Sequence, residues 1–262
     1  MRSRLLFYWI SSLLVSGCTR SGSPPALSFS GGLVVAQIVT DSLQLVDPTR
    51  QRRIPLVRYF PQPGRGSAHK LKVALLNHAY HGKNTDYKFL ADNLVAHGYY
   101  VISIQHELPG DEPIAMTENL YQARYPNWER GVQTIRFVLQ ELAQRQPQLD
   151  WQHVLLMGHS NGGDMVMLLA QEHPELRQVQ QLISFDNRRV PFPRRPYPRV
   201  LSLRSIDQFA DAGVLPTPAE QTQFGIELVQ LPTTIHNDMW DGATEAQKQQ
   251  MNAAVSHFIE KK

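Results

Sequence analysis

VLLMGHSNGG, residues 154–163, places an apolar run before one serine that is flanked by three glycines. The run Val154–Met157 predicts a buried strand, and Met165–Ala170 carries the pattern of a helix. A sharp strand-to-helix turn brings the helix close to the strand, so the residues of the turn must be small. The sequence therefore predicts a strand, a tight turn at Ser160 and a helix, the arrangement of a nucleophile elbow.

Such a turn has a chemical consequence for Ser160. The turn lifts the serine hydroxyl out of the sheet at a helix N-terminus, where backbone N–H groups have no partner inside the helix. The N–H of Asn161 is then free to meet an oxyanion. Ser160 is the candidate nucleophile and Asn161 the first candidate oxyanion donor.

The rest of the chain alternates between predicted strands and helices. Apolar runs predict strands at 33–39, 42–46, 54–60, 72–77, 99–104, 181–185, 199–203 and 226–231, the run at 54–60 being an edge strand because it contains a proline. Helical periodicity predicts helices at 86–97, 127–146 and 245–259, with a long loop over 105–126. This order predicts an α/β fold with a mostly parallel sheet of about eight strands and helices on both faces. It also predicts one domain, 33–262, without a large cap domain, and a site at the carboxyl ends of the strands.

A serine nucleophile needs a base, and the base needs an acid to orient it. His236 follows the last predicted strand and is the candidate base, because its position completes the chain order serine, acid, histidine. Asp207, a few residues after the strand at 199–203, is the first choice of acid. Asp186 and Asp211 remain alternatives, and Asp238 is expected to be a supporting group or a helix cap.

The second oxyanion donor is expected on the loop after the strand at 72–77. The Tyr80 N–H is the choice there, with Ala79 as its neighbour. Four aromatic residues are candidate pocket walls: Tyr121, Tyr125, Trp128 and Trp240. A metal site is not expected, because the ten histidines show no paired helical spacing and no accompanying carboxylate cluster.

With Ser160 in its elbow, Asp207 and His236 in chain order and the loop His78-Ala79-Tyr80, the sequence resembles the α/β-hydrolase superfamily. Within it, the segments 47–57, 86–91 and 96–99 are similar to the branch of dienelactone hydrolases, platelet-activating-factor acetylhydrolases and cutinase-like polyester hydrolases. The resemblance implies ester hydrolysis through an acyl-enzyme without a cofactor. One departure is Ala79, where the family often has glycine.

The N-terminus has the pattern of an export signal. Arg2 and Arg4 precede an apolar run that ends in small residues before Cys18, the only cysteine. This pattern resembles a bacterial lipoprotein signal, which implies cleavage after residue 17 and acylation of Cys18, with residues 18–32 as a flexible tether. The expected location is the bacterial cell envelope, on the periplasmic or outer-membrane side, with a lipid anchor in the membrane. Removing Arg2 and Arg4 lowers the formal charge from +3 to +1, and no basic run predicts nucleic-acid binding.

The leading hypothesis is a lipid-anchored serine esterase that acts on a small-molecule or lipid ester. A thioesterase, peptidase or acyltransferase would use the same triad, since the chemistry at the carbonyl is shared. A non-catalytic envelope binding protein with this fold is the alternative from a different class. The sequence does not distinguish between substrates or oligomeric states.

Overall fold

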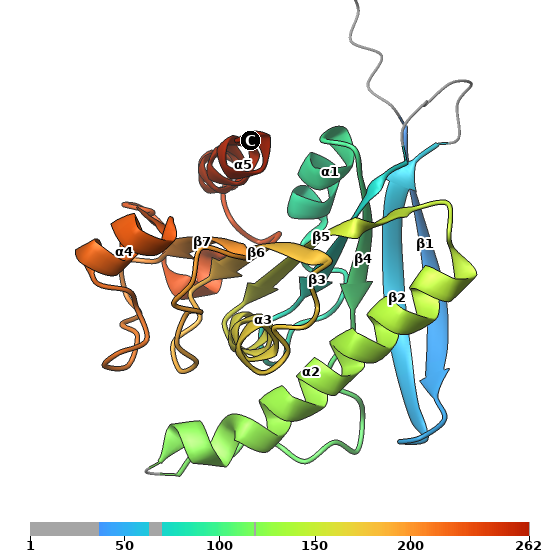
Figure 1. Ribbon diagram of the computed structural model, residues 1–262, viewed down its shortest axis with the longest axis horizontal. Coiled ribbons are helices and arrows are strands. Elements are labelled where there is room, and N and C mark those ends of the chain that lie inside the picture. Colours follow the sequence, from blue (N-terminus) through green and yellow to red (C-terminus); the bar gives the residue numbers. More distant parts are fainter. Residues whose placement is uncertain (1–36, 63–69, 118, 262) are drawn as a thin grey trace, which may run out of the picture. The chain divides into compact units, whose positions relative to one another are not determined.

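The central feature of the fold is an eight-stranded sheet, seen in a computed structural model that describes residues 37–62, 70–117 and 119–261 (Figure 1). The strand order is β1-β2-β4-β3-β5-β6-β7-β8. β2 runs antiparallel to both of its neighbours, β1 and β4, and every other neighbouring pair is parallel. The strands are β1 (Ile38–Asp47), β2 (Arg52–Pro61), β3 (Lys72–Asn77), β4 (Tyr99–Ile104), β5 (Asp150–His159), β6 (Val179–Phe185), β7 (Arg199–Arg204) and β8 (Glu227–Gln230).

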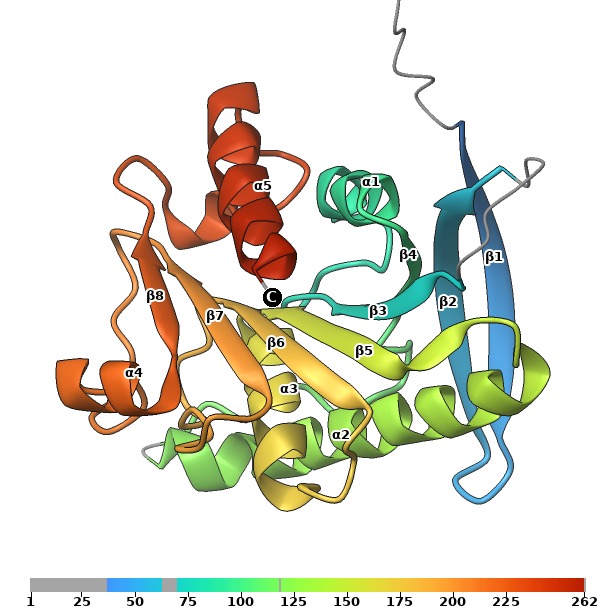
Figure 2. The ribbon, with the colours of Figure 1, turned by 45° about the horizontal axis from the view of Figure 1, so that its top comes forward.

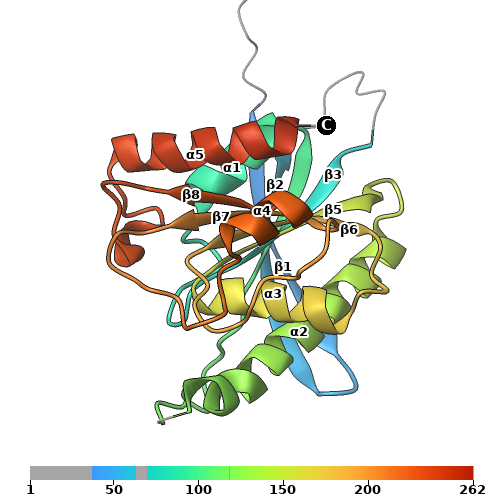
Figure 3. The same ribbon diagram turned by 60° about the vertical axis from the view of Figure 1, so that its left-hand side comes forward.

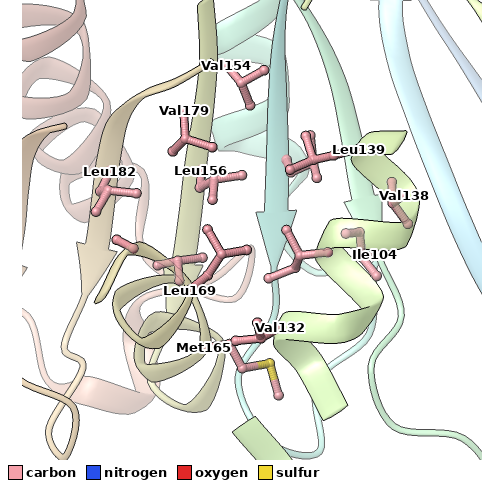
Figure 4. Packing of buried hydrophobic residues seen from close by; sticks show 14 of the residues in the cluster. Ile104, Val132, Val138, Leu139, Val154, Leu156, Met165, Leu169, Val179 and Leu182 are labelled. Atoms are coloured by element: carbon pink, nitrogen blue, oxygen red, sulfur yellow. The ribbon is translucent and has the colours of Figure 1, made fainter. Parts of the chain in front are cut away.

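Helices cover both faces of the sheet (Figures 2 and 3). On one face lie α1 (Lys88–Ala96) and α5 (Glu245–Glu260), and on the other α2 (Leu120–Arg145) and α3 (Asn161–Glu172). Each pair closes its own apolar core against the sheet, with α1 and α5 over Leu76 and α2 and α3 over Leu75. Figure 4 shows the second core, in which Val132 of α2 lies beside Met165 of α3 and Leu156 of β5 belongs to the same cluster.

The central strands are apolar on both faces because helices cover both. In β3 every residue after Lys72 is buried, and β4 is buried throughout. Such strands read as continuous apolar runs, which is why the sequence predicts them well. Because β3 to β8 run parallel, the loops that follow them all emerge at one edge of the sheet.

Two strand predictions at the start of the chain were wrong. The structure has one strand, β1, where two were expected; it runs through the polar residues Thr40 and Asp41, because it pairs with β2 along its whole length. The expected edge strand, β2, lies between β1 and β4, so β1 is the edge. Residues 33–36 of the first predicted strand, the signal 1–17 and the tether 18–32 lie outside the described residues.

Helix α2 begins at Leu120, not at Asn127 as predicted, and contains Pro126. A proline inside a helix removes one backbone hydrogen bond, and for this reason the predicted loop extended to Pro126 and the predicted helix began after it. The first turns are held by the Asn119 side chain, which accepts the Gln122 N–H at 3.1 Å, and by Tyr121, which packs edge-on against Trp128. The expected loop 105–126 therefore ends at Asn119.

A short helix, α4 (Pro218–Phe224), adds one element that the sequence reading did not include. It lies in the connection between β7 and β8, and the described residues contain no separate cap domain. Across residues 37–62, 70–117 and 119–261, no helix combines the length and the apolar character that a membrane span requires.

Candidate active site

The turn between β5 and α3 holds Ser160 in a strained backbone conformation, with φ at 51° and ψ at −113°. The space around the turn is too small for side chains on its glycines. A Cβ on Gly158 would lie 2.2 Å from the carbonyl oxygen of Gly162, and one on Gly162 would lie 2.3 Å from that of Asn77. Positive φ in a non-glycine residue persists only where the surroundings hold it. These glycines therefore allow the close strand–helix contact that presents the serine.

Three side chains from distant parts of the chain meet at this edge of the sheet. His236 Nε2 lies 3.0 Å from Ser160 Oγ, and His236 Nδ1 lies 3.0 Å from Asp186 Oδ2. Asp186 is completely buried and His236 is 8% exposed. The three residues follow β5, β8 and β6, so the parallel sheet brings them together. This geometry is that of a serine, a base and an orienting acid.

The acid in contact with the imidazole is Asp186, and the first choice from sequence, Asp207, was wrong for that contact. The Asp207 carboxylate accepts the backbone N–H of His236 at 2.7 Å instead, so it supports the loop. Asp211 forms an ion pair with Arg189 at 2.6 Å. The reason lies in the sheet order: β6 is the direct neighbour of β5, whereas β7 lies one strand further away. Phe185, the last residue of β6, accepts the Ser160 N–H at 2.7 Å, so Asp186, the next residue, lies close to the serine.

The surroundings of Asp186 favour its charged form. Its Oδ1 accepts the Ser205 N–H at 2.9 Å and lies 3.3 Å from Nε of Arg204. Burial acts to raise the pKa of Asp186, but the contact with His236, the Arg204 charge and the Ser205 N–H together hold that pKa below its usual value. The carboxylate is thus ionised at neutral pH and suited to stabilise a positively charged imidazole.

The Asn161 backbone N–H opens α3 directly after Ser160, where a helix leaves its first N–H groups without internal partners. The Asn161 side chain is fixed on both sides: its Nδ2 donates to Asn127 Oδ1 at 2.8 Å, and its Oδ1 accepts from Trp128 Nε1 at 2.7 Å. Trp128 is fully buried, so it supports Asn161 and is not the pocket wall that was expected. The sequence reading missed Asn127, which no motif marks.

On the opposite side, the loop after β3 forms a turn with Tyr80 and His81 at its centre. The Gly82 N–H donates to the Ala79 carbonyl at 2.9 Å, and His81 has a φ of 65°. The Ala79 N–H is already bound to the Tyr87 hydroxyl at 3.1 Å. Because the Ala79 N–H is occupied by Tyr87, the Tyr80 N–H is the available one of the two candidate oxyanion donors. The Tyr80 hydroxyl accepts the Ile114 N–H at 3.0 Å, which ties this turn to the long loop.

His159 lies beneath His236, with ring centroids 4.8 Å apart. Its Nδ1 contacts the Tyr87 hydroxyl at 2.9 Å, and Tyr87 also binds the Ala79 N–H. Burial and the neighbouring His236 lower the pKa of His159 to about 3, so this ring is neutral at physiological pH. A neutral ring supports His236 by packing and does not compete with it for protons. Asp238, expected as a support or cap, accepts from Gln247 of α5 at 3.0 Å.

The edge of the site exposes apolar side chains. Among the residues that the structure describes, seven large hydrophobic residues are exposed, and all but Val46 lie on segments that follow the carboxyl ends of parallel strands. We call these six the apolar rim: Met116, Tyr121, Ile206, Phe209, Ile235 and Trp240. Phe209 is 87% exposed. Tyr125 instead hydrogen-bonds Glu172 at the end of α3, at 2.5 Å. Of the four candidate pocket walls, Tyr121 and Trp240 therefore lie on the rim.

No group of three or more metal-ligating side chains occurs in residues 37–62, 70–117 and 119–261. The sheet, the elbow and the meeting of Ser160, His236 and Asp186 define the fold class of the α/β hydrolases. Residues 68–185 match the hydrolase family model described as serine aminopeptidase, S33. The chain has the α/β-hydrolase fold, and residues 68–185 are similar to that hydrolase family.

Solved structures of three hydrolases share this fold. A ferulic acid esterase from Streptomyces cinnamoneus has a TM-score of 0.59 and 15% identity, over 86% of this chain and 88% of that one. A putative dienelactone hydrolase from Klebsiella pneumoniae has a TM-score of 0.59 and 14% identity, over 85% and 100%. A fungal esterase from Rhizomucor miehei has a TM-score of 0.59 and 11% identity, over 87% of this chain and 84% of that one. No curated protein matches the chain.

Proposed function

We propose that the chain is a serine esterase in which Ser160 is the nucleophile, His236 the base and Asp186 the orienting acid. The observation that carries the proposal is the continuous contact from Asp186 through His236 to Ser160, with both distances at 3.0 Å. A serine hydroxyl needs such a base to become nucleophilic at neutral pH.

Acylation begins when Ser160 Oγ attacks the ester carbonyl and passes its proton to His236 Nε2. The resulting imidazolium is stabilised by the ionised Asp186 through Nδ1–H. The negative charge that develops on the carbonyl oxygen is met by the N–H groups of Asn161 and Tyr80. Such fixed donors contribute about 3–4 kcal/mol each to transition-state stabilisation in enzymes of this type. The tetrahedral intermediate then collapses, and His236 returns the proton to the departing alcohol.

Deacylation repeats these steps with water as the nucleophile. His236 takes a proton from the water as it attacks the acyl-enzyme, and the same two N–H groups hold the oxyanion. When the second intermediate collapses, the proton returns to Ser160 Oγ and the carboxylic acid leaves. Because one base serves both halves, no further ionisable group is required.

The chemistry of the edge of the site supports esters with an apolar part. The apolar rim supplies contacts for an acyl chain or an aromatic alcohol, and the neighbouring solved structures include proteins described as esterases. An aminopeptidase, the activity in the description of the matching family model, must hold a free amino group with acidic or carbonyl groups. Arg188, two residues after Asp186, instead carries a positive charge without an ion-pair partner among the described residues, which disfavours a cationic substrate.

The proposal is tested by hydrolysis of 4-nitrophenyl esters with acyl chains of two to eight carbons. Ser160→Ala is expected to lower kcat/KM by at least about a thousandfold, on the scale of triad knockouts. Ser42→Ala, an exposed serine on β1, is the matched control and is expected to retain the parent rate. Parallel assays with thioesters and amino-acid nitroanilides distinguish the esterase from a thioesterase or peptidase. Equal rates in parent and Ser160→Ala would overturn the assignment.

We also propose that Cys18 is acylated and anchors the chain to a bacterial envelope membrane. The supporting feature is the order of the basic, apolar and small residues before this single cysteine. Metabolic labelling with a fatty-acid analogue tests it: the parent should incorporate label, and Cys18→Ser should not. Label retained in Cys18→Ser would contradict the proposed anchor.

A further inference from the structure

Three arginines lie on one side of the site. Arg124 belongs to the first turns of α2, and Arg188 and Arg189 follow Asp186 by two and three residues. The backbone N–H groups of Arg188 and Arg189 donate to Asp164 Oδ1 at 3.2 and 2.9 Å. Since Asp164 is in the first turn of α3, this contact fixes the arginine loop beside the turn that holds Ser160.

The three guanidinium groups differ in their partners. Arg189 is neutralised by Asp211 at 2.6 Å. Arg188 Nη1 donates to the neutral Gln208 side chain, and Arg124 Nη2 contacts Met116 Sδ at 2.9 Å. No carboxylate of residues 37–62, 70–117 and 119–261 forms an ion pair with Arg124 or Arg188 within 4.0 Å, whereas Arg189, Arg194 and Arg204 each have one. Arg124 Nε is also buried without a hydrogen-bond partner in this part of the chain.

The charges of Arg124 and Arg188 influence each other. Partial burial and the neighbouring arginines lower the pKa of both side chains. Asp164 and Asp211 face both side chains, and Asp186 also faces Arg188. Each of these acids already has partners: Asp164 accepts three backbone N–H groups, Asp211 pairs with Arg189, and Asp186 contacts His236 and the Ser205 N–H. Arg188 also contributes to the lowered pKa of His159, which packs against His236. Like charges held together in a partly desolvated place are stabilised when an anion binds between them.

We infer that Arg124 and Arg188 form an anion subsite beside Ser160, which binds a carboxylate, phosphate or sulfonate group carried by the ester substrate. The inference rests on the proposed esterase function for its catalytic role. Guanidinium groups suit this task because their fixed N–H donors match the oxygen spacing of such anions. The substrate class is thus an ester with an apolar part for the rim and an anionic part for the arginines.

Kinetics with matched esters test the subsite. Mono-4-nitrophenyl glutarate and 4-nitrophenyl valerate have acyl chains of equal length and differ in one terminal carboxylate, while 4-sulfophenyl butyrate and phenyl butyrate place the difference in the alcohol. We expect the parent to prefer the anionic member of at least one pair by about tenfold or more at low ionic strength, and to lose that preference in about 0.5 M salt. Arg124→Gln and Arg188→Gln should each lower the preference about tenfold.

The matched control is Arg136→Gln, which removes the same charge from an exposed position of the same helix about 18 Å along its axis. It should change neither the preference nor the rate on the neutral esters. A preference for the glutarate over the valerate alone would show that the subsite binds an anion on the acyl part of the ester. A preference for 4-sulfophenyl butyrate over phenyl butyrate alone would show that it binds an anion on the alcohol part. Equal rates within both pairs, or an effect of Arg136→Gln as large as that of Arg188→Gln, would overturn the subsite.

A binding measurement separates this inference from the esterase proposal. In Ser160→Ala, which cannot turn over, calorimetric titration with monobutyl glutarate should give binding that Arg124→Gln and Arg188→Gln each weaken about tenfold. If the parent hydrolyses no ester but this binding is present, the esterase proposal fails and the subsite stands. If the parent hydrolyses neutral esters but the anion does not bind, the subsite alone fails.

Discussion

Replacing Asp186 with asparagine tests which carboxylate orients the base. In the structure Asp186 Oδ2 lies 3.0 Å from His236 Nδ1 and favours the tautomer in which that nitrogen carries the proton. An asparagine amide can donate to Nδ1, which leaves the proton on Nε2, where it faces Ser160 and prevents proton uptake. Loss of the correct tautomer costs about 10³–10⁴ in kcat, or about 4–5.5 kcal/mol of transition-state stabilisation.

Asp207→Asn provides the matched comparison. Its Oδ1 accepts the His236 backbone N–H at 2.7 Å, and an asparagine oxygen still accepts that bond. The variant should therefore keep kcat within about threefold of the parent, since only a partly exposed charge is lost. Each variant removes one charge from a carboxylate that hydrogen-bonds the same histidine, one at the ring and one at the backbone, so their difference reports the contact with the ring.

Stability has to be followed in the same samples. Arg204 is buried, and its Nε lies 3.3 Å from Asp186, so Asp186→Asn leaves a buried charge without its carboxylate. Breaking such a pair costs about 3–5 kcal/mol of folding free energy. Rates on 4-nitrophenyl butyrate should be normalised to the folded fraction from denaturant unfolding. If folded Asp186→Asn retains kcat within tenfold while Asp207→Asn loses a thousandfold, the reasoning is refuted.

Three further predictions concern the surroundings of the site. Burial raises the pKa of Glu107 to about 7, so the folded state keeps a proton that the unfolded chain loses near pH 4.5, and stability falls as pH rises through this window. Glu107→Gln should therefore raise the melting temperature at pH 8 by roughly 5 °C and leave it nearly unchanged at pH 4; a gain at pH 4 as large as that at pH 8 would contradict this. Trp128→Phe removes the N–H that Asn161 Oδ1 accepts at 2.7 Å, and should lower the free energy of unfolding by about 1–3 kcal/mol and kcat by about tenfold. An unchanged kcat in steady-state assays would show that this bond does not fix the oxyanion donor. Phe209→Ser should raise KM for octanoyl esters several-fold more than for acetyl esters, and an equal change for both would argue against contact between the rim and the acyl chain.

Local steric rules explain why part of the site could be predicted from the sequence. The glycines around Ser160 are required by distances of little more than 2 Å, and any chain that makes this turn must carry small residues there. The apolar runs of β3 and β4 predict strands for a similar reason, because both faces of these strands are covered. His236 lies where the order of strands and loops predicts a base.

The acid could not be predicted in this way. Asp186, Asp207 and Asp211 all follow strand-like segments, and the choice among them depends on the lateral order β5-β6-β7 and on which carboxylate faces the ring. The lateral order of strands is a tertiary property. One backbone feature does mark the site: of four non-glycine residues with positive φ among the described residues, three lie here, His81, Ser160 and Asp186.

Tertiary contacts also explain the misread start of α2. Pro126 reads as a loop residue, yet the Asn119 cap and the packing of Tyr121 on Trp128 hold the helix from Leu120 onward. The same early start places Arg124 on the helix instead of in the predicted loop, with its side chain facing Arg188. The residues that sequence reasoning missed are therefore those whose roles arise from contacts between elements far apart in the chain.

The most direct measurement is covalent labelling of the full chain with a fluorophosphonate probe, followed by peptide mass spectrometry. An activated serine is required for this reaction, so the predicted result is one stoichiometric adduct on Ser160, abolished in Ser160→Ala and strongly slowed in His236→Ala and Asp186→Asn. Labelling at another serine, or labelling of Ser160 at an equal rate in the parent and His236→Ala, would contradict the account.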